Sequence, residues 1–96
     1  MMATRLIWDA AKRASNLRKH GLDFADAGWV LDSRYRFDIP EQRGGELRMQ
    51  SLSYVTDVLA SLTVVHTERD GAARVISFRP ASDKECKAYY DWLEGK

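Results

Sequence analysis

The sequence contains few residues that cross-link or interrupt a chain: one cysteine, two prolines and six glycines among 96 residues. Because Cys86 has no second cysteine to pair with, it cannot form an internal disulfide, which fits a reducing cytoplasm. Residues 1–8 lack the pattern of a signal peptide, and no apolar run is long enough to span a bilayer. We therefore expect a cytoplasmic protein that does not enter a membrane.

The sequence also lacks an excess of charge of either sign. Lys and Arg number 15 and Asp and Glu number 14, so a nucleic-acid surface would require segregation of charge rather than a surplus. A chain of this length forms one domain, residues 1–96, and buries roughly two-thirds of its extended-chain surface, which is enough for one core.

Motifs for metal and nucleotide binding are absent from the sequence. His20 and His66 lie far apart, and neither has a His, Cys or carboxylate at the spacing of a zinc site. There is no GxGxxG, no phosphate-binding loop and no GxSxG, and Gly44-Gly45 is better explained as a loop hinge. We therefore expect neither a metal ion nor a cofactor.

The central feature that the sequence does contain is a β-hairpin predicted over Ser61–Arg79. Two runs rich in β-branched residues flank Asp70-Gly71, a pair that favours a tight type I′ turn. Residues directly opposite in a hairpin share a face. Regular pairing therefore places one polar set on a single face, namely His66, Ser77 and Arg79, and places Arg74 on the other.

Helices are predicted on both sides of the strands. The first covers 10–19 with Asp9 as its N-cap, and Ala10, Ala14 and Leu17 are spaced to form its buried face. A second helix is expected after Asp23. The last helix covers 83–93, with Ser82 and Glu85 as a capping box.

Short strands are predicted over 5–8, at Tyr35–Ile39 and over 46–54. Pro40 should end the second of these and open a loop over 40–45. The apolar phase of the third shifts between Met49 and Leu52, which indicates either a bulge or a change of side along the strand. Two N-terminal helices, consecutive strands and a C-terminal helix predict an α+β fold with a mainly antiparallel sheet.

A cationic, hydrogen-bonding set of side chains remains as candidate chemistry. Metal-free RNA cleavage needs a group that removes the 2′-hydroxyl proton, and it needs fixed positive charge near the phosphorus. Arginine can bind two phosphate oxygens at once, and His, Lys, Tyr or a carboxylate can transfer the proton. The set comprises Lys19, His20, Arg48, His66, Arg69, Arg74, Ser77, Arg79 and Tyr89.

Most of these residues also have a structural explanation. His66 on an apolar strand is more often a buried histidine with satisfied hydrogen bonds, and Lys19-His20-Gly21 is a good helix terminus without any substrate. Glu46 and Arg48 can be a surface charge pair, and Glu85 can be only a capping-box partner.

Several motifs, in the right order along nearly the whole chain, resemble the BrnT toxin family. They are Trp8-Asp9 followed by Lys12, Asn16 and Lys19-His20-Gly21, then GELR, VVHTERDG and ISFRPA. The resemblance implies a RelE-like fold and a metal-independent ribonuclease toxin that inhibits translation. It also implies a BrnA-type antitoxin, whose ribbon-helix-helix portion binds operator DNA, in a hetero-oligomer with the toxin.

The resemblance further implies a set of site residues. The polar positions that match the family pattern are Lys19, His20, Glu46, Arg48, Arg74, Ser77, Arg79 and Glu85. We expect Arg79 and Arg48 to clamp phosphate, and we expect Lys19 or His20 to transfer the proton. Glu85 should orient an arginine, and Glu46, Arg74 and Ser77 should contact the substrate.

Two departures from the family pattern leave other functions open. The loop EQRGG stands where the family usually has a His-Ser pair, and Cys86 stands where it usually has arginine. One alternative is therefore a catalytically weakened homologue that acts as a co-repressor with its antitoxin. Another is an RNA-binding domain without chemistry, in which bases stack on Tyr35, Tyr54 or Tyr89.

Overall fold

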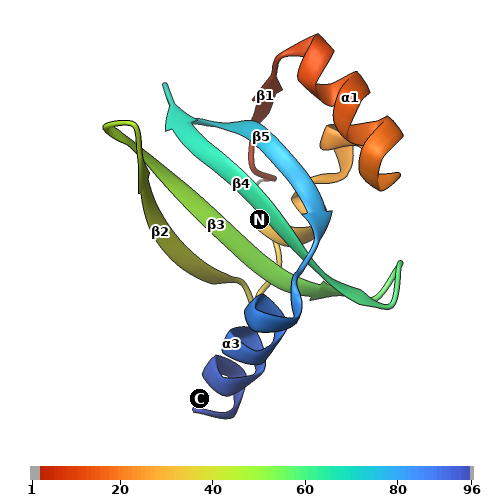
Figure 1. The fold of residues 1–96 in the computed structure, drawn as a ribbon, viewed down its shortest axis with the longest axis vertical. Coiled ribbons are helices and arrows are strands. Elements are labelled where there is room, and N and C mark those ends of the chain that lie inside the picture. Colours follow the sequence, from red (N-terminus) through yellow and green to blue (C-terminus); the bar gives the residue numbers. More distant parts are fainter. Residues whose placement is uncertain (1–2, 96) are drawn as a thin grey trace.

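The strands of this protein form one mixed sheet with helices at its edge and on its faces (Figure 1). The computed structural model describes residues 3–95. Its elements are β1 (Leu6–Trp8), α1 (Ala10–His20), the 3-10 turn η1 (Phe24–Asp26), α2 (Gly28–Leu31), β2 (Phe37–Arg43), β3 (Glu46–Val55), β4 (Ala60–Arg69), β5 (Ala72–Pro80) and α3 (Asp83–Glu94). The strand order is β1-β5-β4-β3-β2, and only the β1–β5 pair is parallel. The α+β class and the C-terminal helix are as predicted.

Helix α1 begins and ends where its capping residues predict. The Asp9 carboxylate accepts hydrogen bonds from the N–H groups of Ala11 (2.8 Å) and Lys12 (3.1 Å). The helix ends at Gly21, whose φ of +70° lies in the left-handed region that a side chain would strain.

The buried face of α1 is not the predicted one. Ala10, Ala14 and Leu17 are exposed, Leu17 by 45%, whereas Asn16 is buried. The reason is that α1 packs beside the edge of β5, where backbone groups need polar partners. Asn16 supplies them through hydrogen bonds to the N–H and C=O groups of Phe78. The apolar spacing therefore indicated the wrong face.

The predicted second N-terminal helix does not form as a continuous helix. The turn η1 and the four-residue helix α2 take its place. Asp23 caps η1 by accepting a hydrogen bond from the Ala25 N–H, and α2 starts at Gly28, a weak helix former. Phe24 and Ala27 of this segment nevertheless have no exposed surface and pack in the hydrophobic core.

Proline does not end strand β2, and the predicted loop over 40–45 is much shorter. Pro40 lies inside β2, which is an edge strand where a residue without an N–H is tolerated. Gly44 and Gly45, with φ of +57° and +80°, form the turn into β3. The register of β3 is continuous on both sides across Met49–Leu52, so no bulge lies there. The alternative, a change of side, holds instead, because Met49 and Leu52 are three residues apart and lie on opposite faces of the sheet.

Strands β4 and β5 form the predicted hairpin, with Asp70 and Gly71 at its turn. The sheet's bulge lies in β5: Val65 pairs with Ser77 and His66 pairs with Val75, which leaves Ile76 between them without a partner.

The bulge changes which polar side chains share a face. Arg74, Ser77 and Arg79 are all on the face that we call the polar face, because their partners on β4 are Thr67, Val65 and Thr63. His66 lies on the opposite face, with the apolar core. The predicted grouping of His66 with Ser77 and Arg79 is therefore wrong, since one extra residue reverses the alternation beyond it.

Helix α3 covers one end of the polar face. Its predicted capping box is present: the Glu85 N–H donates to Ser82 Oγ (3.1 Å) and the Ser82 N–H donates to Glu85 Oε1 (2.9 Å). Trp92 stacks on Phe37 of β2, with ring centroids 5.0 Å apart. Within residues 3–95, no helix has the length and apolar composition needed to cross a membrane.

Candidate functional site

Arg79 and Glu85 form a two-point ion pair where β5 meets α3. Arg79 Nη1 donates to Glu85 Oε1 (2.7 Å) and Nη2 donates to Oε2 (3.0 Å). Glu85 Oε1 also accepts hydrogen bonds from Thr63 Oγ1 and the Ser82 N–H. Burial opposes the ionised form of Glu85, but these hydrogen bonds, led by those from Arg79, outweigh it and lower the pKa to about 2. The carboxylate thus holds the guanidinium in one orientation.

A cavity of about 250 Å³ lies between α1 and the bulge of β5. It is lined by Lys12, Ser15, Asn16, Lys19, His20, Ile76 and Ser77. The structure therefore brings together three of the predicted site residues, Lys19 and His20 from α1 and Ser77 from β5.

Burial and nearby positive charge both favour the neutral form of His20. Partial burial, followed by the positive charges of Lys19 and Arg79, lowers the pKa of His20 from its ordinary 6.5. Arg79 therefore lies within electrostatic reach of the imidazole. A neutral imidazole can accept a proton, and a fixed guanidinium can stabilise developing negative charge.

Arg48 and Glu46 lie on the polar face but do not line this cavity. Arg48 Nε donates to Glu46 Oε1 at 3.1 Å, as expected of a surface pair. Arg48 is two strands away from Arg79 and four residues before Leu52, which lies in the same cross-strand row as Arg79. These offsets correspond to roughly 17 Å between the two Cα atoms. The two arginines therefore enter the polar face from separate positions, although the charge of Glu41, the β2 partner of Arg48, reaches Arg79.

Arg74 lies on the polar face near the start of α1. It is opposite Thr67 on β4 and Ile7 on β1. The pKa of Asp9 is lowered mainly by the N–H groups at the start of α1, and the charge of Arg74 adds to this effect. Arg74 thus lies at the other end of α1 from His20.

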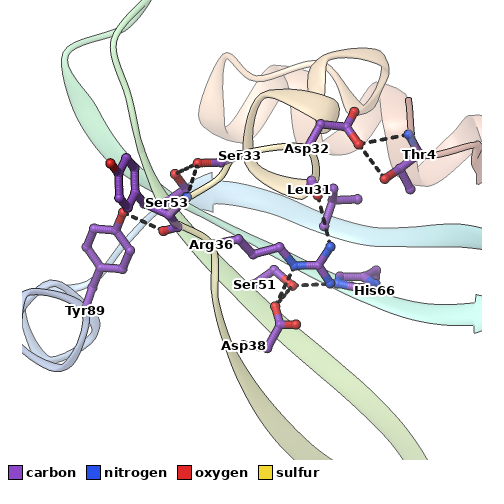
Figure 2. A network of polar contacts seen from close by, with 11 residues as sticks. Thr4, Leu31, Asp32, Ser33, Arg36, Asp38, Ser51, Ser53, His66 and Tyr89 are labelled. Carbon is purple, nitrogen blue, oxygen red and sulfur yellow. Dashed lines mark hydrogen bonds and ion pairs between the residues drawn. The ribbon is translucent and has the colours of Figure 1, made fainter. Parts of the chain in front are cut away.

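His66 belongs to a separate polar network on the core side of the sheet (Figure 2). Ser51 Oγ donates to Asp38 Oδ1 (2.6 Å) and lies 2.8 Å from His66 Nε2. Asp38 also accepts a hydrogen bond from Arg36 Nε (2.7 Å), and Arg36 Nη1 donates to the Leu31 carbonyl. This network joins β2, β3 and β4 to the end of α2.

The Ser–His–Asp composition of this network does not make Ser51 a nucleophile. Its one hydroxyl proton is donated to Asp38, so the hydroxyl accepts its second hydrogen bond from His66 Nε2–H. A catalytic histidine would instead accept the serine proton. Burial, with the charge of Arg36, lowers the pKa of His66 to about 4, so the ring is neutral. His66 is a buried, hydrogen-bonded histidine.

A larger cavity, of about 570 Å³, lies beside α3 and is lined mostly by tyrosines and hydroxyl side chains. Tyr35 and Tyr54 are exposed there, but Tyr89 is only 1% exposed and donates its hydroxyl proton to the Tyr35 carbonyl. Tyr89 therefore cannot stack on a base as the RNA-binding alternative supposed. The residues that line this cavity carry no charge, so it offers no cationic side chain to a phosphate.

Sequence reasoning missed several residues around the 250 Å³ cavity. Lys12 and Lys19 are seven residues apart on α1, two helical turns, and this spacing could have placed both on the cavity side. Asn16 and His20, one helical turn apart, are two of the three residues of α1 that are not exposed, and both line the cavity. Thr63, which supports Glu85, gave no signal because its partner comes from another element.

Comparison with known families decides how these residues are interpreted. The family model described as the ribonuclease toxin BrnT of type II toxin–antitoxin systems matches residues 8–85. This chain belongs to the BrnT family. Membership in this type II toxin–antitoxin family implies an antitoxin partner. The matched residues span Lys19 to Glu85 but do not reach Tyr89. No curated protein matches the chain significantly.

In the described part of this BrnT chain, no three His, Cys, Asp or Glu side chains gather as metal ligands.

The Glu85 ion pair predicts a specific loss of stability in acid. Because its folded pKa of about 2 lies below the ordinary 4.5, Glu85 stabilises the fold fully above about pH 4.5 and loses this effect as the pH falls towards 2. Glu85→Gln should lower the free energy of unfolding by about 2 kcal/mol at pH 7. Urea unfolding should show that this difference shrinks between pH 5 and pH 2.5. The pKa of Asp23 is also lowered to about 2, mainly by its hydrogen bond from Arg13. Because Asp23 titrates in both wild type and Glu85→Gln, its effect cancels from the difference between their free energies of unfolding. A difference that stays constant with pH would contradict the assignment.

Proposed function

We propose that this BrnT-family protein cleaves RNA without a metal ion, by attack of a 2′-hydroxyl on the adjacent phosphorus. The proposal rests mainly on one observation: His20 and Lys19 share a cavity with Ser77, within electrostatic reach of the oriented guanidinium of Arg79. The family match supports the choice of RNA as substrate class.

The proposed reaction assigns one task to each group. His20 accepts the 2′-hydroxyl proton while the O2′–P bond forms and the P–O5′ bond breaks. The products are a 2′,3′-cyclic phosphate and a 5′-hydroxyl, whose oxygen takes up a proton from water. Arg79, held by Glu85, stabilises the negative charge that gathers on the phosphate oxygens. Lys19 is the second candidate for proton transfer, because it lines the same cavity.

The remaining site residues are proposed to bind the flanking nucleotides. Ser77 would donate a hydrogen bond to the phosphate in the cavity. Arg74 lies on the same face three residues earlier, and Arg48 with Glu46 lies across the sheet. Because Arg48 does not line the cavity that holds His20 and Ser77, we propose that it binds a neighbouring phosphate rather than the one being cleaved.

The cellular role that we propose follows the family. The protein would inhibit translation in the cytoplasm, and a BrnA-type antitoxin with a ribbon-helix-helix portion would neutralise it in a hetero-oligomer and carry the operator-DNA binding. The α+β arrangement supports a RelE-like relationship. The antitoxin partner itself is implied by the family match.

A second candidate function is a partner-binding homologue that no longer cleaves RNA. The observation that favours it is the engagement of both terminal nitrogens of Arg79 by Glu85, which leaves fewer donors for phosphate. Such a protein would act as a co-repressor with its antitoxin. It would bind the antitoxin tightly and cut no RNA under any condition.

Replacement of Arg79 tests the cleavage proposal. Arg79→Ala should lower the rate of RNA cleavage about 10²- to 10³-fold, since one preorganised charge at the reacting phosphate contributes this much. It should also abolish growth arrest when the protein is expressed alone. Arg34→Ala is the matched control, because Arg34 is exposed between α2 and β2. Unchanged cleavage by a folded Arg79→Ala protein would remove Arg79 from the site.

The proton-transfer role of His20 predicts a pH dependence. A general base must be unprotonated, so the rate should fall as the pH drops through the pKa of His20, which lies below 6.5. The pH–rate profile of purified protein should therefore show an acidic limb that His20→Ala removes and Lys19→Ala retains. Loss of the limb in Lys19→Ala alone would assign proton transfer to Lys19 instead.

A further inference from the structure

The outer edge of β5 has a strand neighbour over only part of its length. In the described sheet, β1 pairs with Ala73–Val75, and residues 76–80 have no strand on that side. Helix α1 lies along this edge, away from β2 (Figure 1). The residues of β5 that carry the proposed site, Ser77 and Arg79, lie in this stretch.

One side chain of α1 takes the place of the missing strand. Asn16 Oδ1 accepts a hydrogen bond from the Phe78 N–H (3.1 Å), and Asn16 Nδ2 donates to the Phe78 carbonyl (2.7 Å). Asn16 Nδ2 also donates to the Leu22 carbonyl (3.0 Å), in the segment that follows α1. The side chain of Asn16 is only 8% exposed. Its two amide protons and its oxygen all have hydrogen-bond partners within the protein.

This pairing can form at only one place on β5. The N–H and C=O groups of a strand residue point to the same edge and alternate along the strand. Phe78 therefore offers both groups to α1, whereas Ser77 and Arg79 direct theirs to β4. Two residues further along, Pro80 has no N–H, and two residues earlier lies the unpaired Ile76 of the bulge. Asn16 thus fixes α1 in one register along β5.

The geometry points to Asn16 as the positioning residue that holds His20 and Lys19 over Ser77 and beside Arg79. His20 follows Asn16 by four residues, one helical turn, on the same side of α1. Phe78 stands between Ser77 and Arg79 in β5. One side chain therefore sets the separation between the proton-transfer group and the phosphate-binding groups. The catalytic consequence rests on the proposed ribonuclease function, but the positioning itself does not.

The other polar attachment of α1 supplies a matched control. Arg13 forms a two-point ion pair with Asp23 (2.7 and 3.0 Å) and lies over the Trp8 ring. These contacts tie α1 to η1 and β1, and none of them involves a residue of the 76–80 stretch. Arg13→Ala should therefore loosen α1 without releasing the register at Phe78.

The experiment measures the imidazole titration of His20 by NMR together with RNA cleavage kinetics, in wild type, Asn16→Ala, Asn16→Ser and Arg13→Ala. Circular dichroism at the assay temperature identifies the folded variants.

In folded Asn16→Ala, the pKa of His20 should rise towards 6.5, because the imidazole moves away from Arg79 and into water. The kcat should fall about 10- to 100-fold with little change in KM. Asn16→Ser, which can satisfy one backbone group of Phe78 but not both, should shift both quantities less, and it replaces Asn16→Ala if that variant does not fold.

The outcomes separate this inference from the proposed function. Wild-type His20 titration in a folded Asn16 variant would overturn the positioning role. An equal shift of the His20 pKa in Arg13→Ala would also overturn the positioning role. That result would show that any loosening of α1 is enough to displace His20. If no protein cleaves RNA, the proposed function fails, but the His20 titrations still decide whether Asn16 positions the site.

Discussion

The unpaired residue Ile76 reverses the alternation of side chains along β5, and the site depends on that reversal. Without it, Arg74 would lie on the opposite face from Ser77 and Arg79, and His66 would lie with them. With it, the three β5 residues share the face that α3 partly covers, and His66 joins Ser51 and Asp38 on the core side. A single extra residue thus separates the candidate catalytic groups from a buried structural network.

Polar side chains, fully or partly buried, attach both helices to this strand. Asn16 joins α1 to Phe78, and Glu85 joins α3 to Arg79 and Thr63. A buried polar group without its partner costs more free energy than an apolar contact, so each attachment is specific for one geometry. The two attachments are adjacent in β5, at residues 78 and 79, and together they place His20 and Arg79 at the same end of the strand.

Local signals in the sequence predicted what depends on local chemistry. Asp9 and Gly21 set the ends of α1, Asp70-Gly71 set the hairpin turn, and Ser82 with Glu85 set the start of α3. The α+β class followed from the order of these elements. The β5 bulge was not predictable, because the run ARVISFR reads equally well as a regular strand and only its pairing with β4 leaves Ile76 out. Asn16 was missed for the same reason: its partner lies 62 residues away.

The central claim is that this BrnT-family protein cleaves RNA through the 2′-hydroxyl with groups of its own. The most direct test incubates the purified protein, in the presence of a chelator, with a short RNA and with the same RNA carrying 2′-O-methyl groups. The account predicts that the RNA is cut to products with a 2′,3′-cyclic phosphate and a 5′-hydroxyl, and that the methylated strand stays intact. Cleavage of both strands at the same rate, or of neither, would contradict it.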